Sequence, residues 1–157
     1  MSQAHKDASE RVKLEHEAVA SLLRTAAQDK RGTTSHRKDP STGSPLQDQA
    51  ILETAAITAN DAHALLLLAK AEGFMRTYLT GQGIQLPPQP KLANLINRCF
   101  KECNLRDPAN KIHANVASEF HVLRIQRNTY AHGHGSSVVP SVGRIVNVLG
   151  RFFNDLP

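Results

Sequence analysis

The feature that most constrains the fold is a long apolar stretch with helical spacing, which begins at Ser44–Gln47 and continues to Thr80. Its first four residues favour a helix start: the serine can cap, the proline suits the first turn, and the glutamine can close a capping box. Gly81 then provides a natural stop. The stretch is apolar on more than one side, which predicts a central position. It forms either one very long helix or two helices broken near Asn60-Asp61.

The rest of the chain predicts an all-α bundle of four to five helices. With 157 residues, 4% aromatics and no Trp, it suits a single domain with a core of Leu, Ile, Val and Ala. No segment shows strand alternation between hairpin turns. We expect residues 1–45 to form an N-terminal helix plus a mobile polar loop, and 46–157 to form the bundle. The other expected helices span about Ser9–Gln28, Lys91–Cys103, Asp107-Pro108 to Tyr130, and Ser141 onward, with loops at 29–44, 81–90 and 133–140. The last helix carries an expected apolar stripe of Val142, Ile145, Val146, Leu149 and Phe152.

Charge and composition favour a soluble, cytoplasmic protein. The net charge of +5 is compatible with a nucleic-acid ligand, but many other proteins are equally basic. The N-terminus is polar, and the longest apolar run, Ala64–Ala69, is too short to cross a bilayer, so we expect no signal peptide and no membrane partner. A basic cluster in the first loop is read as a solvated linker in preference to a nucleic-acid arm. It contains Lys30, Arg31, Arg37 and Lys38.

Arg127 occupies an unusual position in the pattern of the fourth helix. Six residues fall within roughly 80° of one another around the helix axis. They are Ile112, Val116, Phe120, Leu123, Arg127 and Tyr130. Because arginine is rarely buried without a partner, Arg127 either pairs with a buried carboxylate or lines a cleft at a ligand or a second subunit.

Glu72 is the predicted partner of Arg127. It lies on a second apolar seam, which contains Asp61, Leu65, Leu68, Glu72, Met75 and Leu79. Opposite charges that are out of place on two helices expected to pack together predict an ion pair. The alternative is that Glu72 reaches the rim and is solvated.

The segment from Arg127 to His132 resembles the Arg-x4–6-His motif of HEPN (higher eukaryote and prokaryote nucleotide-binding) domains. Asn128 fills the polar position that often follows the arginine there, and the run from Glu72 to Leu79 also looks like such domains. The resemblance covers about residues 46–157. It implies a dimeric helical bundle in which the Arg and His of two subunits face each other. Many members are metal-independent endoribonucleases of toxin–antitoxin or antiviral systems. Others only bind nucleotides or scaffold partners.

The chemistry of RNA cleavage fits these residue types. Histidine titrates near neutrality, so we assign His132 to acid and base work, with His134 as an alternative at six intervening residues. Arg127 would stabilise charge on phosphate oxygens, and Asn128 would orient the phosphate or the imidazole. A dimer would supply both an acid and a base, and a 2′,3′-cyclic phosphate would form without a metal or other cofactor.

His121 and Arg124 lie one turn apart near the motif and would add RNA contacts, although a solvated face is the commoner arrangement.

The rival function is a catalytically silent helical module that binds a nucleotide, RNA, an antitoxin or another regulatory protein. Zinc bound by Cys99 and Cys103 with a histidine is disfavoured, because their spacing is not that of a knuckle.

Overall fold

The computed structural model describes residues 3–106, 111–131 and 140–154. The described residues form five helices and one small two-stranded sheet. The elements in chain order are α1 (Gln3–Asp29), β1 (Thr34–Lys38), β2 (Pro45–Gln47), α2 (Asp48–Gly81), α3 (Leu92–Arg106), α4 (Ala114–Ala131) and α5 (Val142–Asn154). The predicted all-α bundle is therefore confirmed.

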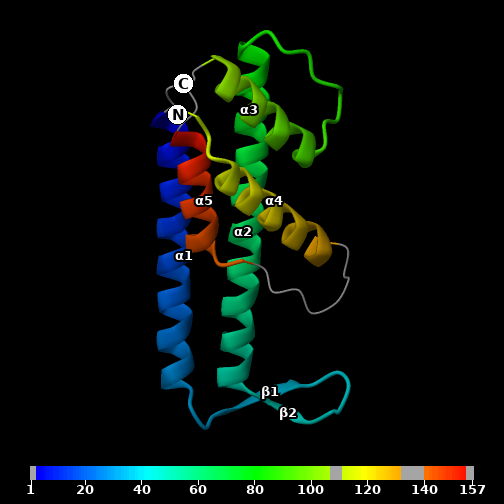
Figure 1. The fold of residues 1–157 in the computed structure, drawn as a ribbon. Coiled ribbons are helices and arrows are strands. Elements are labelled where there is room, and N and C mark those ends of the chain that lie inside the picture. Colours follow the sequence, from blue (N-terminus) through cyan, green and yellow to red (C-terminus); the bar gives the residue numbers. More distant parts are fainter. Residues whose placement is uncertain (1–2, 107–110, 132–139, 155–157) are drawn as a thin grey trace.

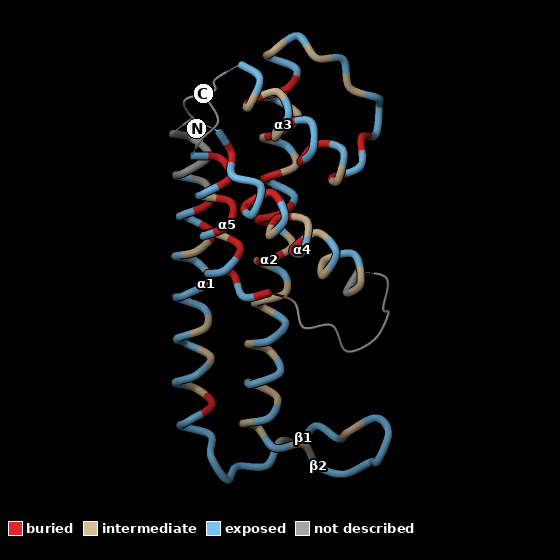
Figure 2. The backbone as a smooth tube through the Cα atoms, in the orientation of Figure 1, coloured by how far each residue is buried: buried red, intermediate tan, exposed pale blue. Residues whose placement is uncertain are grey.

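The long helices α1 and α2 lie side by side, and α3, α4 and α5 pack along only one part of their length (Figure 1). In the remaining part α1 and α2 pack only on each other, and the β-hairpin that connects them lies at its end. We call this part, residues 17–60 with the hairpin included, the stalk. Ala27 is the only buried side chain among those described in the stalk, whereas buried residues concentrate in the bundle (Figure 2).

Helix α2 is one continuous helix of 34 residues that ends at the predicted glycine, Gly81. Its bundle half packs against α1, α3 and α5 and contributes Ala64, Leu67, Leu68, Ala71, Met75 and Leu79 to the core. Val12 brings α1 into the same core. By length and composition alone α2 could also cross a membrane, a criterion that core helices of soluble proteins meet too.

The expectation that no strand forms was wrong at residues 29–44. Strands β1 and β2 pair antiparallel, with Thr34 opposite Gln47 and Lys38 opposite Pro45. Between them, the Asp39 carboxylate accepts hydrogen bonds from the backbone N–H groups of Ser41 at 2.7 Å and Thr42 at 3.0 Å. The Ser41 hydroxyl donates to the same carboxylate oxygen, and this bond, followed by the two backbone bonds, lowers the pKa of Asp39 and organises the turn.

The predicted helix start at Ser44–Gln47 was also wrong, because Pro45–Gln47 form β2 and α2 begins at Asp48. Gln47 makes no capping hydrogen bond through its side chain. Instead the Thr33 hydroxyl donates to Asp48 Oδ2 at 2.8 Å, and the Asp48 N–H donates to the Thr33 carbonyl at 3.2 Å. A contact from the preceding loop thus fixes the start, and Asp48 places negative charge at the positive end of the helix dipole.

Helix α4 begins at Ala114 and not at the predicted Asp107-Pro108, which lies outside the described residues. The reason is a clamp from α3: Asn104 Oδ1 accepts the Ile112 N–H at 2.9 Å, and Asn104 Nδ2 donates to the Ile112 carbonyl at 3.4 Å. Ile112 is therefore buried from a non-helical segment. The first member of the predicted seam reaches the core without being helical.

Helix α5 starts against the middle of α2. The Val142 N–H donates to Asn60 Oδ1 at 3.3 Å, and the Ser141 hydroxyl accepts the Arg144 N–H at 3.3 Å. Asn60 therefore satisfies an N-terminal amide of another helix. Of the predicted apolar stripe on α5, four residues are buried and Val146 is partly buried; the four are Val142, Ile145, Leu149 and Phe152.

Four phenylalanines hold α2, α4 and α5 together. Phe120 packs edge to face on Phe152 with ring centroids 5.0 Å apart, and Phe74 packs in the same way on Phe153 at 4.8 Å. Phe120, Phe152 and Phe153 are fully buried. The few aromatics of the chain are thus concentrated where three helices meet.

Replacement of Phe120 by alanine should lower the free energy of unfolding by about 3–5 kcal/mol, because a large buried ring is lost and a cavity remains. Urea unfolding followed by circular dichroism would measure this. The exposed Val122→Ala is the matched control on the same helix and should cost far less. Equal costs at both positions would contradict the packing described.

Two histidines meet where the stalk joins the bundle. The rings of His16 on α1 and His63 on α2 lie 5.4 Å apart, and neither Nδ1 atom has a hydrogen-bond partner in the part of the chain described. Burial, and then His63, lower the pKa of His16 below its ordinary value of 6.5. Glu17 opposes this shift and Arg24 adds to it. The folded protein therefore disfavours protonation of His16.

The free energy of unfolding should consequently decrease as the pH falls below about 6.5, since unfolded His16 takes up a proton more readily than folded His16. Above that pH the neutral form predominates in both states and the effect is absent. Urea unfolding across this range should show a smaller pH dependence for His16→Asn. The exposed His113→Asn should retain the wild-type dependence, and identical slopes for all three proteins would exclude this role of His16.

Candidate functional site

Arg127 extends from the buried face of α4 near the end of that helix. Val116, Phe120 and Leu123 anchor this face in the core. One turn after Leu123 the same face carries Arg127, whose side chain is 30% exposed. The helix therefore holds a guanidinium at the edge of the core, partly open to solvent. This is the position that the periodicity of the sequence predicted.

Glu72 on α2 lies between two arginines. Its Oε2 is 3.8 Å from Arg127 Nη1, and its Oε1 is 2.7 Å from Arg76 Nη2. The predicted Glu72–Arg127 ion pair is therefore confirmed. The Glu72 side chain is 22% exposed, so the solvated alternative does not describe it. The three side chains carry a net charge of +1, which leaves one positive charge for an anionic ligand.

Arg76 is the closer partner of Glu72, and we did not predict this contact from the sequence. The signal was present, because residues four apart on a helix are neighbours and Glu followed by Arg is a favourable order. The guanidinium of Arg127 makes no hydrogen bond within the described residues, since 3.8 Å is beyond hydrogen-bond distance. Its five N–H donors can therefore serve a ligand.

The structure describes only part of the rest of the motif. Asn128 is exposed on α4, one position round the helix from Arg127. His132 and His134 fall in the segment 132–139, outside the described residues, as does the side chain of Tyr130. Of the predicted motif, the structure therefore describes the Arg127–Asn128 half and its carboxylate partner.

His121 is bonded to α3 and not to the Glu72–Arg127 pair. His121 Nε2 lies 2.8 Å from Asn97 Oδ1. Burial lowers the pKa of His121, and the charge of Arg124 lowers it further. The Arg124 Nε atom is buried without a hydrogen-bond partner in the described chain. Neither residue is the fully solvated side chain that is common at such positions.

A groove of about 420 Å³ lies beside this histidine, between α3 and the connector that precedes it. Asn97 links the groove to His121, because it lines the groove and is hydrogen-bonded to the histidine. Leu86, Pro87 and Pro90 supply apolar walls, and Arg98 and Lys101 supply positive charge. No hydrophobic period predicts this groove, since part of its lining is an irregular proline-containing segment.

Cys99 and Cys103 are both buried in the core. Burial, together with the neighbouring Cys103, raises the pKa of Cys99 to about 12. Its thiol therefore stays protonated at neutral pH, whereas metal binding and nucleophilic attack need the thiolate. Within the described ranges, no three His, Cys, Asp or Glu side chains are grouped to hold a metal. Cys99 packs as a small apolar residue.

Comparisons with protein-family models, with curated proteins and with solved structures found no match for this chain.

The Glu72–Arg127 contact can be tested by charge reversal. Glu72→Arg and Arg127→Glu should each lower the free energy of unfolding by about 1 kcal/mol or less, because both side chains are partly solvated. The double variant should recover only part of this loss, since Arg76 would then lie beside a positive charge. Urea unfolding in low salt would give the coupling energy. Strictly additive single effects would show that the contact contributes nothing.

Proposed function

We propose that the protein is a metal-independent endoribonuclease of the HEPN type. The proposal is carried by one observation: Arg127 is held at the edge of the core beside Glu72 while its hydrogen-bond donors remain unused within the described residues. An arginine that served only structure would direct its donors into a carboxylate at hydrogen-bond distance, as Arg76 does. The motif that begins at Arg127 adds a histidine, His132, five positions later.

The reaction assigns a task to each residue. The ribose 2′-oxygen loses its proton and attacks the phosphorus, and the bond from phosphorus to the 5′-oxygen breaks. The leaving oxygen takes up a proton, so the products are a 2′,3′-cyclic phosphate and a 5′-hydroxyl. Arg127 stabilises charge on the phosphoryl oxygens and His132 transfers protons. Glu72 positions Arg127, and Asn128 contacts the phosphate or the imidazole. A symmetric pair of subunits supplies two histidines, one acid and one base.

RNA cleavage in EDTA is the direct test. Wild type should cut a mixed-sequence RNA and leave cyclic phosphate ends, whereas Arg127→Ala should lose about 100-fold or more in rate because a charge-stabilising donor is absent. His132→Ala should lose a comparable factor. Arg127→Lys keeps the charge without the planar fork and should fall between wild type and the alanine variant.

Matched controls make the result specific. Arg11→Ala removes an arginine that is 81% exposed on α1, and His113→Ala removes an exposed histidine; both should cleave like wild type. An RNA with 2′-deoxy sugars should bind without being cut. If wild type leaves RNA intact while binding it, the silent module is the better description. If Arg127→Ala and His132→Ala both cut normally, the proposed site is wrong.

A further inference from the structure

The stalk leaves a large apolar surface in water. Leu22 on α1 is 71% exposed and Ile57 on α2 is 64% exposed. Of the residues described in the stalk, only Ala27 is buried. Two helices can cover only the sides that they turn toward each other, so the outer sides need another layer. Exposed apolar patches of this kind mark interaction surfaces.

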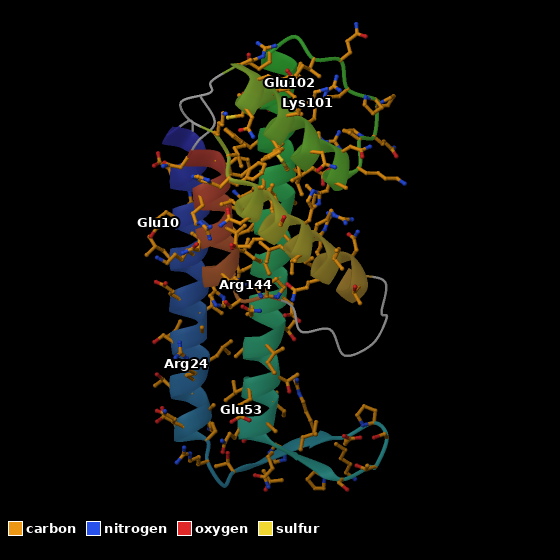
Figure 3. All side chains as sticks on the ribbon, viewed as in Figure 1. Glu10, Arg24, Glu53, Lys101, Glu102 and Arg144 are labelled. Carbon is orange, nitrogen blue, oxygen red and sulfur yellow. The ribbon has the colours of Figure 1, made fainter. Side chains whose placement is uncertain are left out.

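One side of the stalk is shaped into a groove of about 320 Å³ between α1 and α2. Its apolar lining consists of Leu23, Ala27, Leu52, Ala56 and Ile57. The charges at its edges are separated by sign: Arg24 belongs to α1 and Arg31 to the turn that follows it, whereas Glu53 belongs to α2. Figure 3 shows Arg24 and Glu53 on these neighbouring helices in the stalk.

We propose that the groove binds the stalk of a second copy of this chain, so that two stalks form a four-helix bundle. A two-fold axis parallel to the stalk brings α1 of each copy opposite α2 of the other at the same height. Arg24 of each copy then faces Glu53 of its partner, and one symmetry operation makes both ion pairs. The apolar residues of the two grooves pack together between these pairs, as in bundle cores.

The edge charges favour this partner over other classes. A nucleic acid along the groove would meet the carboxylate of Glu53 on one side, which repels phosphate. A lipid surface would force Arg24 and Glu53 toward the hydrocarbon together with the apolar lining. A second copy satisfies both signs at once. The stalk also lies apart from Arg127, because Glu53 is about 28 Å from Glu72 along α2. The stalk interface therefore uses none of the residues assigned to the proposed nuclease, although that nuclease also needs two subunits.

The size of the surface sets the expected affinity. Two helical segments of 13 residues give a face about 20 Å long and about 20 Å wide, or about 400 Å² per copy. This is small for a specific interface, so a dimer in the micromolar range is expected. A weak, partly ionic interface should also weaken in salt.

Sedimentation velocity of the full chain, from about 1 to about 200 micromolar, tests the proposal. Wild type should shift from monomer to dimer with concentration. Arg24→Glu and Glu53→Arg should each weaken the dimer about tenfold, because each places like charges opposite one another. The double variant Arg24→Glu/Glu53→Arg restores opposite charges in both pairs and should return to the wild-type constant. Circular dichroism would show that each variant is folded.

Reversal of the exposed Arg11–Glu15 pair on α1 is the matched control and should leave self-association unchanged. A wild type that stays monomeric throughout would overturn the proposal. So would a dimer whose affinity ignores the single reversals, or single reversals that the double variant does not rescue. Monomers that float with neutral phosphatidylcholine vesicles would assign the groove to a lipid surface instead. A wild type that stays monomeric throughout would also count against the paired site of the proposed nuclease, whereas a dimer that ignores the reversals would overturn the stalk interface alone. Loss of RNA cleavage in the variants of Arg127 and His132 would leave the stalk interface untouched.

Discussion

The structure depends on the burial of one half of α2. Ala64, Leu67, Ala71, Met75 and Leu79 have no exposed surface, and at about 100° per residue they form one stripe about 120° wide along the helix. Helices α1, α3 and α5 pack against α2, and buried residues of α4 belong to the same core. The packing of the other helices on α2 ends near Asn60, and beyond that point only the two helices of the stalk continue.

The same packing explains why charges occur at the edge of the core. Glu72 follows the seam of α2 and Arg127 follows the seam of α4, so the contact between the helices brings them together. Arg76 neutralises the carboxylate more closely than Arg127 does. A pair in which one arginine is bound and the other is held at 3.8 Å leaves a positive charge oriented but available. Such an arrangement suits an anion-binding site better than a structural ion pair.

Hydrophobic spacing predicted the features that depend on the sequence of a single helix. The helical stretch that ends at Gly81, the stripe of α5 and the Glu72–Arg127 pair all follow from spacing along single helices. Two features depended on contacts between residues that are far apart in the sequence, and the hydrophobic pattern could not reveal them: Thr33 fixes the start of α2, and Asn104 holds Ile112 outside α4. The hairpin turn is local, because Asp39 bonds to Ser41 and Thr42. In all three cases a polar side chain makes the bond, and neither hydrophobic period applies to it.

The continuity of α2 fixes the angular phase between its two halves. Asn60 receives α5, and Glu72 lies twelve residues farther along the same unbroken helix. Each residue turns a helix by about 100°, so one residue inserted between them would rotate the stalk groove by that angle about α2. An insertion of four residues would rotate it by only about 40°. The number of residues in this helix is therefore constrained even at positions where the side chain is not. The exposed positions of the stalk should tolerate substitution far better than deletion.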